Sequence, residues 1–198
     1  MTETIKIELY VENLGETQAI ATQLAHIVPA GTIILLEGDL GSGKTTFMQS
    51  FGKALGIQTT IASPTFTLID EYMEGRLPLY HIDLYRLEPP QVPSLHLEEY
   101  WRGEDFPLGV VAIEWASKLP TVPAEHLKIN LSVPRPERSP LSSQNLNLDP
   151  DTGSGEFAES EEFVEDLPCD RQIQLIAQGS TYIDLLKQFQ NKAAILFV

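Results

Sequence analysis

A glycine-rich segment constrains the fold of this chain more than any other feature. Residues 38–45 read Gly-Asp-Leu-Gly-Ser-Gly-Lys-Thr and meet the pattern G-x-x-x-x-G-K-[ST], with an additional glycine at position 41. Such a loop turns sharply and brings several backbone N–H groups toward an anion, which requires residues without a Cβ atom. Residues 32–37 form an apolar run before it, and residues 45–55 form an amphipathic segment after it. The sequence therefore predicts a buried strand, a phosphate-binding loop and a helix in this order.

This loop predicts that the chain binds a magnesium–nucleoside triphosphate and acts as an ATPase. Lys44 supplies a point charge at the β- and γ-phosphates, the Thr45 hydroxyl coordinates magnesium, and the helix presents its positive N-terminal end to the same anion. The alternative is a chance glycine-rich turn between a strand and a helix. The residues of this segment that we expect to bind the nucleotide are Leu40, Gly41, Ser42, Gly43, Lys44, Thr45 and Thr46.

A second acidic residue is expected to complete the magnesium site from the end of another buried strand. Glu114 follows the apolar run at residues 110–113 and is the best candidate. Its alternative interpretation is a solvated carboxylate at a strand end. The next residue, Trp115, either stacks on adenine or fills the core, and the high average burial of tryptophan favours the core.

Two further polar positions are open to more than one interpretation. Asp83 is a charged residue inside a strand-like stretch, so it either faces water or serves a site. Thr65, in a Ser-Pro-Thr triplet, either reaches the γ-phosphate or its magnesium, or caps a turn, which is the more common use of such a residue. His81 and Cys169 have no sequence partner that favours a role as nucleophile or metal ligand.

The remaining hydrophobic pattern predicts an α/β fold of three layers, the P-loop NTPase fold, around a mixed and mainly parallel central sheet. Asn13 and Glu16 resemble a capping box ahead of a first amphipathic helix. Two alternating stretches around Glu74, Gly75 and Arg76 predict a hairpin, which makes the sheet mixed. We expect strands at residues 66–72, 78–84, 110–113, 127–133 and 172–177, a weak helix at 95–101 and a closing helix at 182–189.

The acidic charge of the chain is concentrated in one segment. The formal net charge is -15, and residues 139–169 contain eight Asp or Glu and no Lys or Arg. Such a segment cannot bury enough apolar surface to offset the entropy of ordering its backbone. We therefore expect a flexible acidic insertion at about residues 134–170 within a single domain spanning residues 1–198. Because nonspecific binding of nucleic acids relies on clustered Lys and Arg, any link to RNA is expected to be indirect.

Cysteine content and hydropathy predict a soluble protein of the cytoplasm. The one cysteine cannot form an internal disulfide, and residues 1–10 lack the basic start and apolar run of a signal peptide. No segment approaches the roughly 20 consecutive apolar residues that are needed to span a bilayer. We therefore expect no membrane contact.

The order and spacing of the motifs resemble the bacterial TsaE family. The resemblance is carried by residues 38–46 (GDLGSGKTT), 63–66 (SPTF), 81–86 (HIDLYR) and 113–115 (IEW), and it extends to residues 171–173 (RQI). TsaE proteins are P-loop ATPases of the pathway that installs threonylcarbamoyl on the adenosine next to the anticodon, in tRNAs reading codons that begin with A. The departure is residues 134–170, where the family has only a short turn.

The resemblance implies roles for the residues outside the loop. Glu114 provides the second metal contact, and Trp115 packs near the adenine, which reverses the interpretation from burial alone. Asp83 becomes a catalytic or water-positioning carboxylate, and Thr65 belongs to a switch-like loop. Family members act with TsaD and TsaB as the ATP-driven component that resets or regulates the complex, and they do not transfer the threonylcarbamoyl group themselves.

Two other functions stay open on the sequence. A small-molecule P-loop kinase needs an acceptor lid that usually carries several arginines, whereas residues 87–107 contain only Arg102. A nucleotide-switched binding module with negligible turnover belongs to another class of protein. No arginine finger is recognisable, so we expect slow ATP hydrolysis by the isolated protein and completion of the site by a partner.

Overall fold

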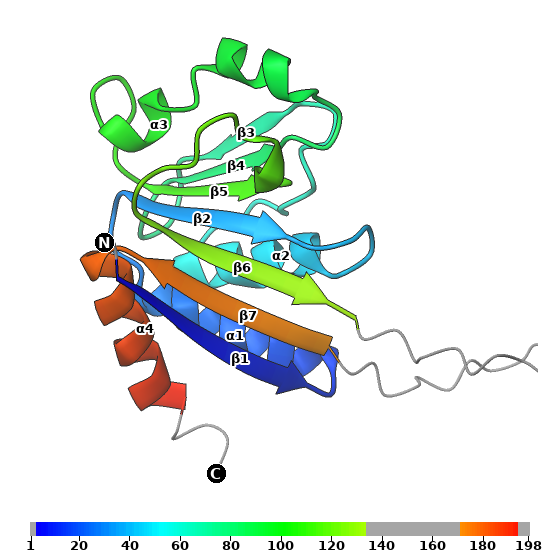
Figure 1. Cartoon of the computed structure of the whole chain (residues 1–198), viewed down its shortest axis with the longest axis vertical. Coiled ribbons are helices and arrows are strands. Elements are labelled where there is room, and N and C mark those ends of the chain that lie inside the picture. The colour runs from blue at the N-terminus through cyan, green and yellow to red at the C-terminus, as the bar shows by residue number, and fades with distance from the viewer. Residues whose placement is uncertain (1–2, 134–170, 194–198) are drawn as a thin grey trace, which may run out of the picture.

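In the computed structural model, which describes residues 3–133 and 171–193, seven strands form one continuous sheet in the order β1-β7-β6-β2-β5-β4-β3 (Figure 1). The predicted acidic insertion at residues 134–170 lies outside the described residues. The strands that precede and follow it in the sequence, β6 and β7, pair directly with each other. The strands are β1 (Thr4–Val11), β2 (Thr32–Glu37), β3 (Ile69–Tyr72), β4 (Leu79–Asp83), β5 (Val110–Glu114), β6 (His126–Ser132) and β7 (Arg171–Gln178).

The centre of the sheet is parallel. Strands β6, β2, β5 and β4 run in one direction, whereas β7 and β1 on one side and β3 on the other join in antiparallel pairs. This confirms the predicted mixed sheet and the β3–β4 hairpin. Because parallel strands end at the same edge of a sheet, the carboxyl ends of β2, β5 and β4 lie together where the glycine-rich loop begins.

Helices cover both faces of the sheet, as the prediction of three layers requires. On one face, α1 (Leu14–Ile27), α2 (Lys44–Leu55) and α4 (Ser180–Ala193) pack into the larger core. The smaller core on the other face lies under the 3-10 helices η1 (Pro89–Leu95) and η2 (Ala116–Lys118) and the short α3 (Glu99–Arg102). No helix in residues 3–133 or 171–193 is long and apolar enough to cross a membrane.

Strand β2 contributes to both cores, which explains its apolar run. Ile34 and Leu36 pack into the larger core, and Ile33 and Leu35 pack into the smaller one. Successive side chains of a strand point to opposite faces, so a strand buried on both faces needs apolar residues at every position. All four of these side chains are buried.

Three parts of the fold differ from the sequence prediction. Strand β1 was not predicted, although its Ile7 and Val11 are buried against the larger core. The strand predicted from residue 66 begins only at Ile69, because Leu68 has a left-handed backbone with φ 67° that bends the chain. The weak helix predicted at residues 95–101 is divided between η1 and α3. The two prolines at the start of η1 fit there because the first turn of a helix does not use their missing N–H groups.

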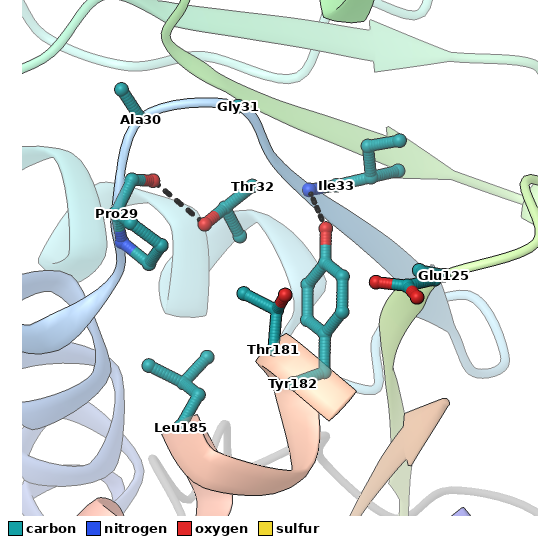
Figure 2. A pocket seen from close by; sticks show the side chains of 9 residues that line it. All are labelled: Pro29, Ala30, Gly31, Thr32, Ile33, Glu125, Thr181, Tyr182 and Leu185. Atoms are coloured by element: carbon teal, nitrogen blue, oxygen red, sulfur yellow. Dashed lines mark hydrogen bonds between the residues drawn. The ribbon is translucent and has the colours of Figure 1, made fainter. Parts of the chain in front are cut away.

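Tyr182 connects α4 to the beginning of β2. Its hydroxyl accepts a hydrogen bond of 2.7 Å from the backbone N–H of Ile33, which Figure 2 shows at the wall of a small cavity. Strand β6 pairs with β2 only from Ile34 onward. The Tyr182 hydroxyl therefore accepts the hydrogen bond of the Ile33 N–H in place of a neighbouring strand. Burial raises the pKa of the Tyr182 phenol above its ordinary value.

We predict that Tyr182→Phe lowers the free energy of unfolding by about 1–3 kcal/mol, because the buried Ile33 N–H loses its acceptor. Denaturant unfolding measures the change. The matched control is Tyr10→Phe, since Tyr10 is 73% exposed and its loss should stay within about 0.5 kcal/mol. Equal stabilities of the two variants would contradict the assigned role of Tyr182.

A comparison of the wild type with Tyr182→Phe also tests the raised pKa of Tyr182. A group whose pKa is higher in the folded state stabilises the fold below its ordinary value of 10 and loses this contribution as the pH rises further. The stability gap between the wild type and Tyr182→Phe should therefore narrow above about pH 10. A stability gap that stays constant from neutral to alkaline pH would contradict the raised pKa of Tyr182.

Candidate functional site

The glycine-rich loop between β2 and α2 is built on backbone conformations that favour glycine. Gly38 has φ 147°, and a Cβ atom on it would lie 2.3 Å from the carbonyl oxygen of Leu131 in β6 and 2.5 Å from Ser42 Oγ. Gly43 has φ 101° and is the N-cap residue of α2. The first N–H groups of a helix have no intrahelical partner, so this end of α2 is suited to bind an anion.

The loop forms one wall of a pocket of about 260 Å³ at the carboxyl edge of the parallel strands. The ends of β4 and β5 form the opposite wall. Every residue predicted for the site lines this pocket except Ser42, a buried residue of the loop. The lining residues are Leu40, Gly41, Gly43, Lys44, Thr45, Thr46, Ser63, Thr65, Asp83, Tyr85, Glu114 and Trp115. Their roles toward a nucleotide stay predictions.

Lys44 holds its ammonium group inside the loop. Its Nζ donates hydrogen bonds of 2.8 Å to the carbonyl oxygen of Gly38 and 3.2 Å to that of Asp39. It also lies 4.4 Å from the ring centroid of Trp115, within the range of a cation–π interaction. Trp115 also packs partly against the smaller core, as the interpretation from burial expects, whereas its contact with adenine stays a prediction.

Asp83 is buried at the end of β4 and accepts three hydrogen bonds. Thr65 Oγ1 and Ser63 Oγ donate to Oδ2 at 2.6 and 3.0 Å, and the backbone N–H of Tyr85 donates to Oδ1 at 2.8 Å. With 2% exposure, Asp83 does not face bulk water, and its service in a site stays a prediction. The hydrogen bond from Thr65 Oγ1 to Asp83 shows that this hydroxyl contacts a carboxylate of the pocket.

Glu114 is buried at the end of β5, with 2% exposure, so the interpretation as a solvated carboxylate is wrong. Its Oε1 lies 2.9 Å from Nε2 of His81, a fully buried residue of β4. Asp83 and Glu114 are paired in register between β4 and β5. The two carboxylates are therefore held by the sheet itself.

The residues of the pocket fit a magnesium ion that is shared with a bound triphosphate. The Thr45 hydroxyl and the Glu114 carboxylate are hard oxygen donors, which is what Mg²⁺ prefers. Among the described residues no group of three or more His, Cys, Asp or Glu is arranged to hold a metal ion. Mg²⁺ is commonly bound by one or two protein oxygens together with substrate phosphates and water, so this donor set suits it only with a nucleotide present.

Sequence reasoning missed four residues around this pocket. Ser63 bonds Asp83, His81 bonds Glu114, and the ring of Tyr85 lies 5.0 Å from that of Trp115. Arg171 begins β7 beside the loop, with Nη1 3.9 Å from where a Cβ of Gly43 would be. Its Nε and Nη1 are buried without a hydrogen-bond partner in the described part of the chain. The alternation of His81 with Asp83 was a signal that they share a strand face. Arg171 belongs to the motif at residues 171–173, but that motif does not indicate a position beside the loop.

A second cavity, of about 240 Å³, lies at the other end of β2 (Figure 2). It is bounded by residues 29–33, by the start of α4 and by Glu125, the one charged residue among those that line it. A single carboxylate and no cation make this cavity unsuited to a triphosphate. The pocket at the carboxyl edge, which the glycine-rich loop lines, is the candidate site.

Comparisons with known proteins point to one family. A family model described as threonylcarbamoyl adenosine biosynthesis protein TsaE matches residues 11–139. A Synechocystis protein named tRNA threonylcarbamoyladenosine biosynthesis protein TsaE is 52% identical over 119 residues, covering 60% of this chain and 76% of that protein. A Bacillus subtilis protein of the same name is 47% identical over 118 residues, covering 59% and 72%.

A solved structure agrees with these sequence matches. The crystal structure of Bacillus subtilis YdiB superposes with a TM-score of 0.64 at 31% sequence identity, covering 98% of each chain. The likeness therefore extends over the whole sheet and the helices around it.

We predict that Thr65→Val lowers the free energy of unfolding by about 1.5–3 kcal/mol, because it removes a short hydrogen bond to the buried Asp83 carboxylate. Thr17→Val is the matched control. The Thr17 hydroxyl is fully buried and has no hydrogen-bond partner among the described residues, so its replacement should be neutral or stabilising. Chemical denaturation of both variants checks the prediction, which fails if Thr65→Val is as stable as the wild type.

Proposed function

Because this chain belongs to the TsaE family of threonylcarbamoyl adenosine biosynthesis proteins, we propose that it is a magnesium-dependent ATPase of that pathway. It is required for threonylcarbamoylation of the adenosine adjacent to the anticodon in tRNAs reading codons that begin with A. It acts in the cytoplasm with the TsaD and TsaB protein complex as a regulator or resetting component, and it meets tRNA only indirectly. The observation that carries the ATPase part is the pocket in which the glycine-rich loop faces Asp83 and Glu114.

The loop residues bind the triphosphate in this proposal. Backbone N–H groups at the start of α2 surround the phosphates, and Lys44 exchanges the carbonyl oxygens of Gly38 and Asp39 for phosphate oxygens. Thr45 and Glu114 hold Mg²⁺, which supplies positive charge to neutralise the phosphates. Trp115 packs near the adenine and keeps contact with the ammonium group of Lys44.

Asp83 positions the attacking water. A carboxylate offers about four lone-pair sites, and the three hydrogen bonds from Ser63, Thr65 and Tyr85 leave one of them on Oδ1. Thr65 is the movable member of this group. When it turns toward the γ-phosphate, Ser63 still holds Oδ2, so the carboxylate keeps its orientation. Hydrolysis releases Thr65 to Asp83 again, which is a nucleotide-dependent switch of the Ser63–Thr65 segment.

The surroundings of the pocket support a protein partner at its mouth. Leu40, on the loop, is 82% exposed, and Phe66, directly after Thr65, is 84% exposed. Contiguous exposed apolar surface marks interaction sites, whereas single exposed apolar residues are common on any protein, so these two side chains offer only points of contact for a partner. The net charge of -15 argues against direct binding of the tRNA backbone by this chain. TsaD and TsaB are therefore the proposed partners at this position.

Of the two other functions, the kinase has less support. Arg102, the only arginine of residues 87–107, lines a separate groove with Trp101 and Leu119 and does not line the nucleotide pocket. Among the described residues no arginine lines the nucleotide pocket, so the pocket walls carry no arginine clamp for a transferred phosphate. The binding module with negligible turnover uses the same pocket and the same switch, so turnover is what separates it from the ATPase.

We expect slow release of phosphate from ATP and Mg²⁺ by the isolated protein and faster release after TsaD and TsaB are added. Lys44→Ala removes the cation at the phosphates, and Asp83→Ala removes the carboxylate that positions water. Each variant should lower turnover about 100-fold or more. Phosphate release is measured for the wild type and both variants, alone and with the partners.

Lys53→Ala is the control for Lys44→Ala. Lys53 is an exposed lysine in the last turn of the same helix, outside the pocket, so its loss should leave turnover unchanged. If ATP binds but no phosphate is released under any condition, the protein is a binding module. Transfer of the γ-phosphate to an added small molecule would instead identify a kinase.

A further inference from the structure

His81 lies next to the proposed metal site, although the ATPase mechanism above does not use it. It precedes Asp83 by two residues in β4, so both side chains point to the same face of the sheet. Register pairs Asp83 with Glu114 and His81 with Ala112 of β5. The imidazole therefore lies on the same face of the sheet as the two carboxylates, two residues closer to the start of β4.

The contact between His81 and Glu114 joins Nε2 of the imidazole to Oε1 of the carboxyl group at 2.9 Å. An ionised carboxylate accepts hydrogen bonds and donates none, so toward an ionised Glu114 the hydrogen lies on Nε2, which donates. Among the described residues this is the one side-chain hydrogen bond that Glu114 receives. Both side chains are buried, with 0% and 3% exposure, so water does not compete for the bond from outside.

A packing role alone does not explain a histidine at this position. Burial of an imidazole in the sheet costs free energy unless both nitrogens are hydrogen-bonded. Nδ1 of His81 has no partner in the described part of the chain. A leucine would fill a similar space without leaving a polar atom unpaired. The bond to Glu114 is thus the interaction that distinguishes histidine from an apolar residue here.

We infer that His81 is a positioning residue that holds one oxygen of Glu114 so that the other is presented to the magnesium ion of the nucleotide pocket. The inference rests on the proposed function, in which Thr45 and Glu114 would hold Mg²⁺. Residues that hydrogen-bond a metal ligand fix its orientation, and their loss typically weakens metal binding about 10- to 100-fold. His81 acts through Glu114 and touches neither the nucleotide nor the metal.

Two substitutions separate positioning from packing. His81→Leu keeps a similar volume and removes the donor, whereas the amide nitrogen of His81→Gln reaches the position of Nε2 and keeps a donor. We would titrate Mn²⁺ into each protein with a non-hydrolysable ATP analogue, using electron paramagnetic resonance, and would measure binding of the analogue in EDTA. We expect Mn²⁺ binding to weaken about 10- to 100-fold in His81→Leu and to stay near the wild-type value in His81→Gln. Binding of the metal-free analogue should be the same in all three proteins.

The outcomes distinguish the inference from the function on which it rests. If the wild type binds the analogue but no Mn²⁺ with it, the proposed magnesium site fails and the inference fails with it. If the wild type binds Mn²⁺ and His81→Leu binds it equally well, only the inference is overturned. If both variants lose binding of the analogue in EDTA, His81 has a structural role and the inference is overturned. The same holds if His81→Gln binds Mn²⁺ as weakly as His81→Leu.

A third variant covers the case in which His81→Leu does not fold, which thermal unfolding detects. The shorter amide of His81→Asn reaches only the position of Nδ1, so it cannot donate to Glu114. His81→Asn should therefore bind Mn²⁺ as weakly as expected for the leucine variant. Equal Mn²⁺ affinity in His81→Asn and His81→Gln would contradict the positioning role.

Discussion

The burial of β2 on both faces is the constraint on which the rest of the structure depends. Its side chains alternate between the two cores, and its backbone is bonded to β5 on one side and β6 on the other. A strand held in this way cannot shift, so the loop that follows starts from a fixed point. The close approach of Gly38 to the Leu131 carbonyl oxygen shows how little room the neighbouring strand leaves for that loop. The position of the N-terminus of α2 follows from these contacts.

The two buried carboxylates of the pocket differ in what surrounds them. Asp83 receives three hydrogen bonds, from Ser63, Thr65 and a backbone N–H group, whereas Glu114 receives one from His81. A carboxylate with most of its acceptor sites occupied is held firmly but has little capacity for a metal ion. A carboxylate bonded through one oxygen keeps the other for a ligand. The separate roles proposed for Asp83 and Glu114 are consistent with this difference in their surroundings.

Features with a local pattern could be predicted from the sequence. The glycine-rich loop, the apolar run of β2 and the acidic residue at the end of β5 each depend on a few consecutive residues. What was missed depends on pairs that are far apart in the chain. Strand β1 is held by β7, which follows more than 150 residues later, and His81 meets Glu114 across 33 residues. Hydrophobic periodicity reports which face of an element is buried but not which neighbour buries it.

The pairing of Asp83 with Glu114 in register has a consequence for how this protein can change over evolutionary time. The separation of two residues paired on adjacent strands is set by the strand spacing, about 4.8 Å across the hydrogen bonds, and not by any loop. Loops of such a protein can lengthen, shorten or exchange sequence while the geometry between its carboxylates is inherited unchanged. A lineage is then free to add a segment as long as residues 134–170 between β6 and β7, since the added chain is no part of the register between β4 and β5.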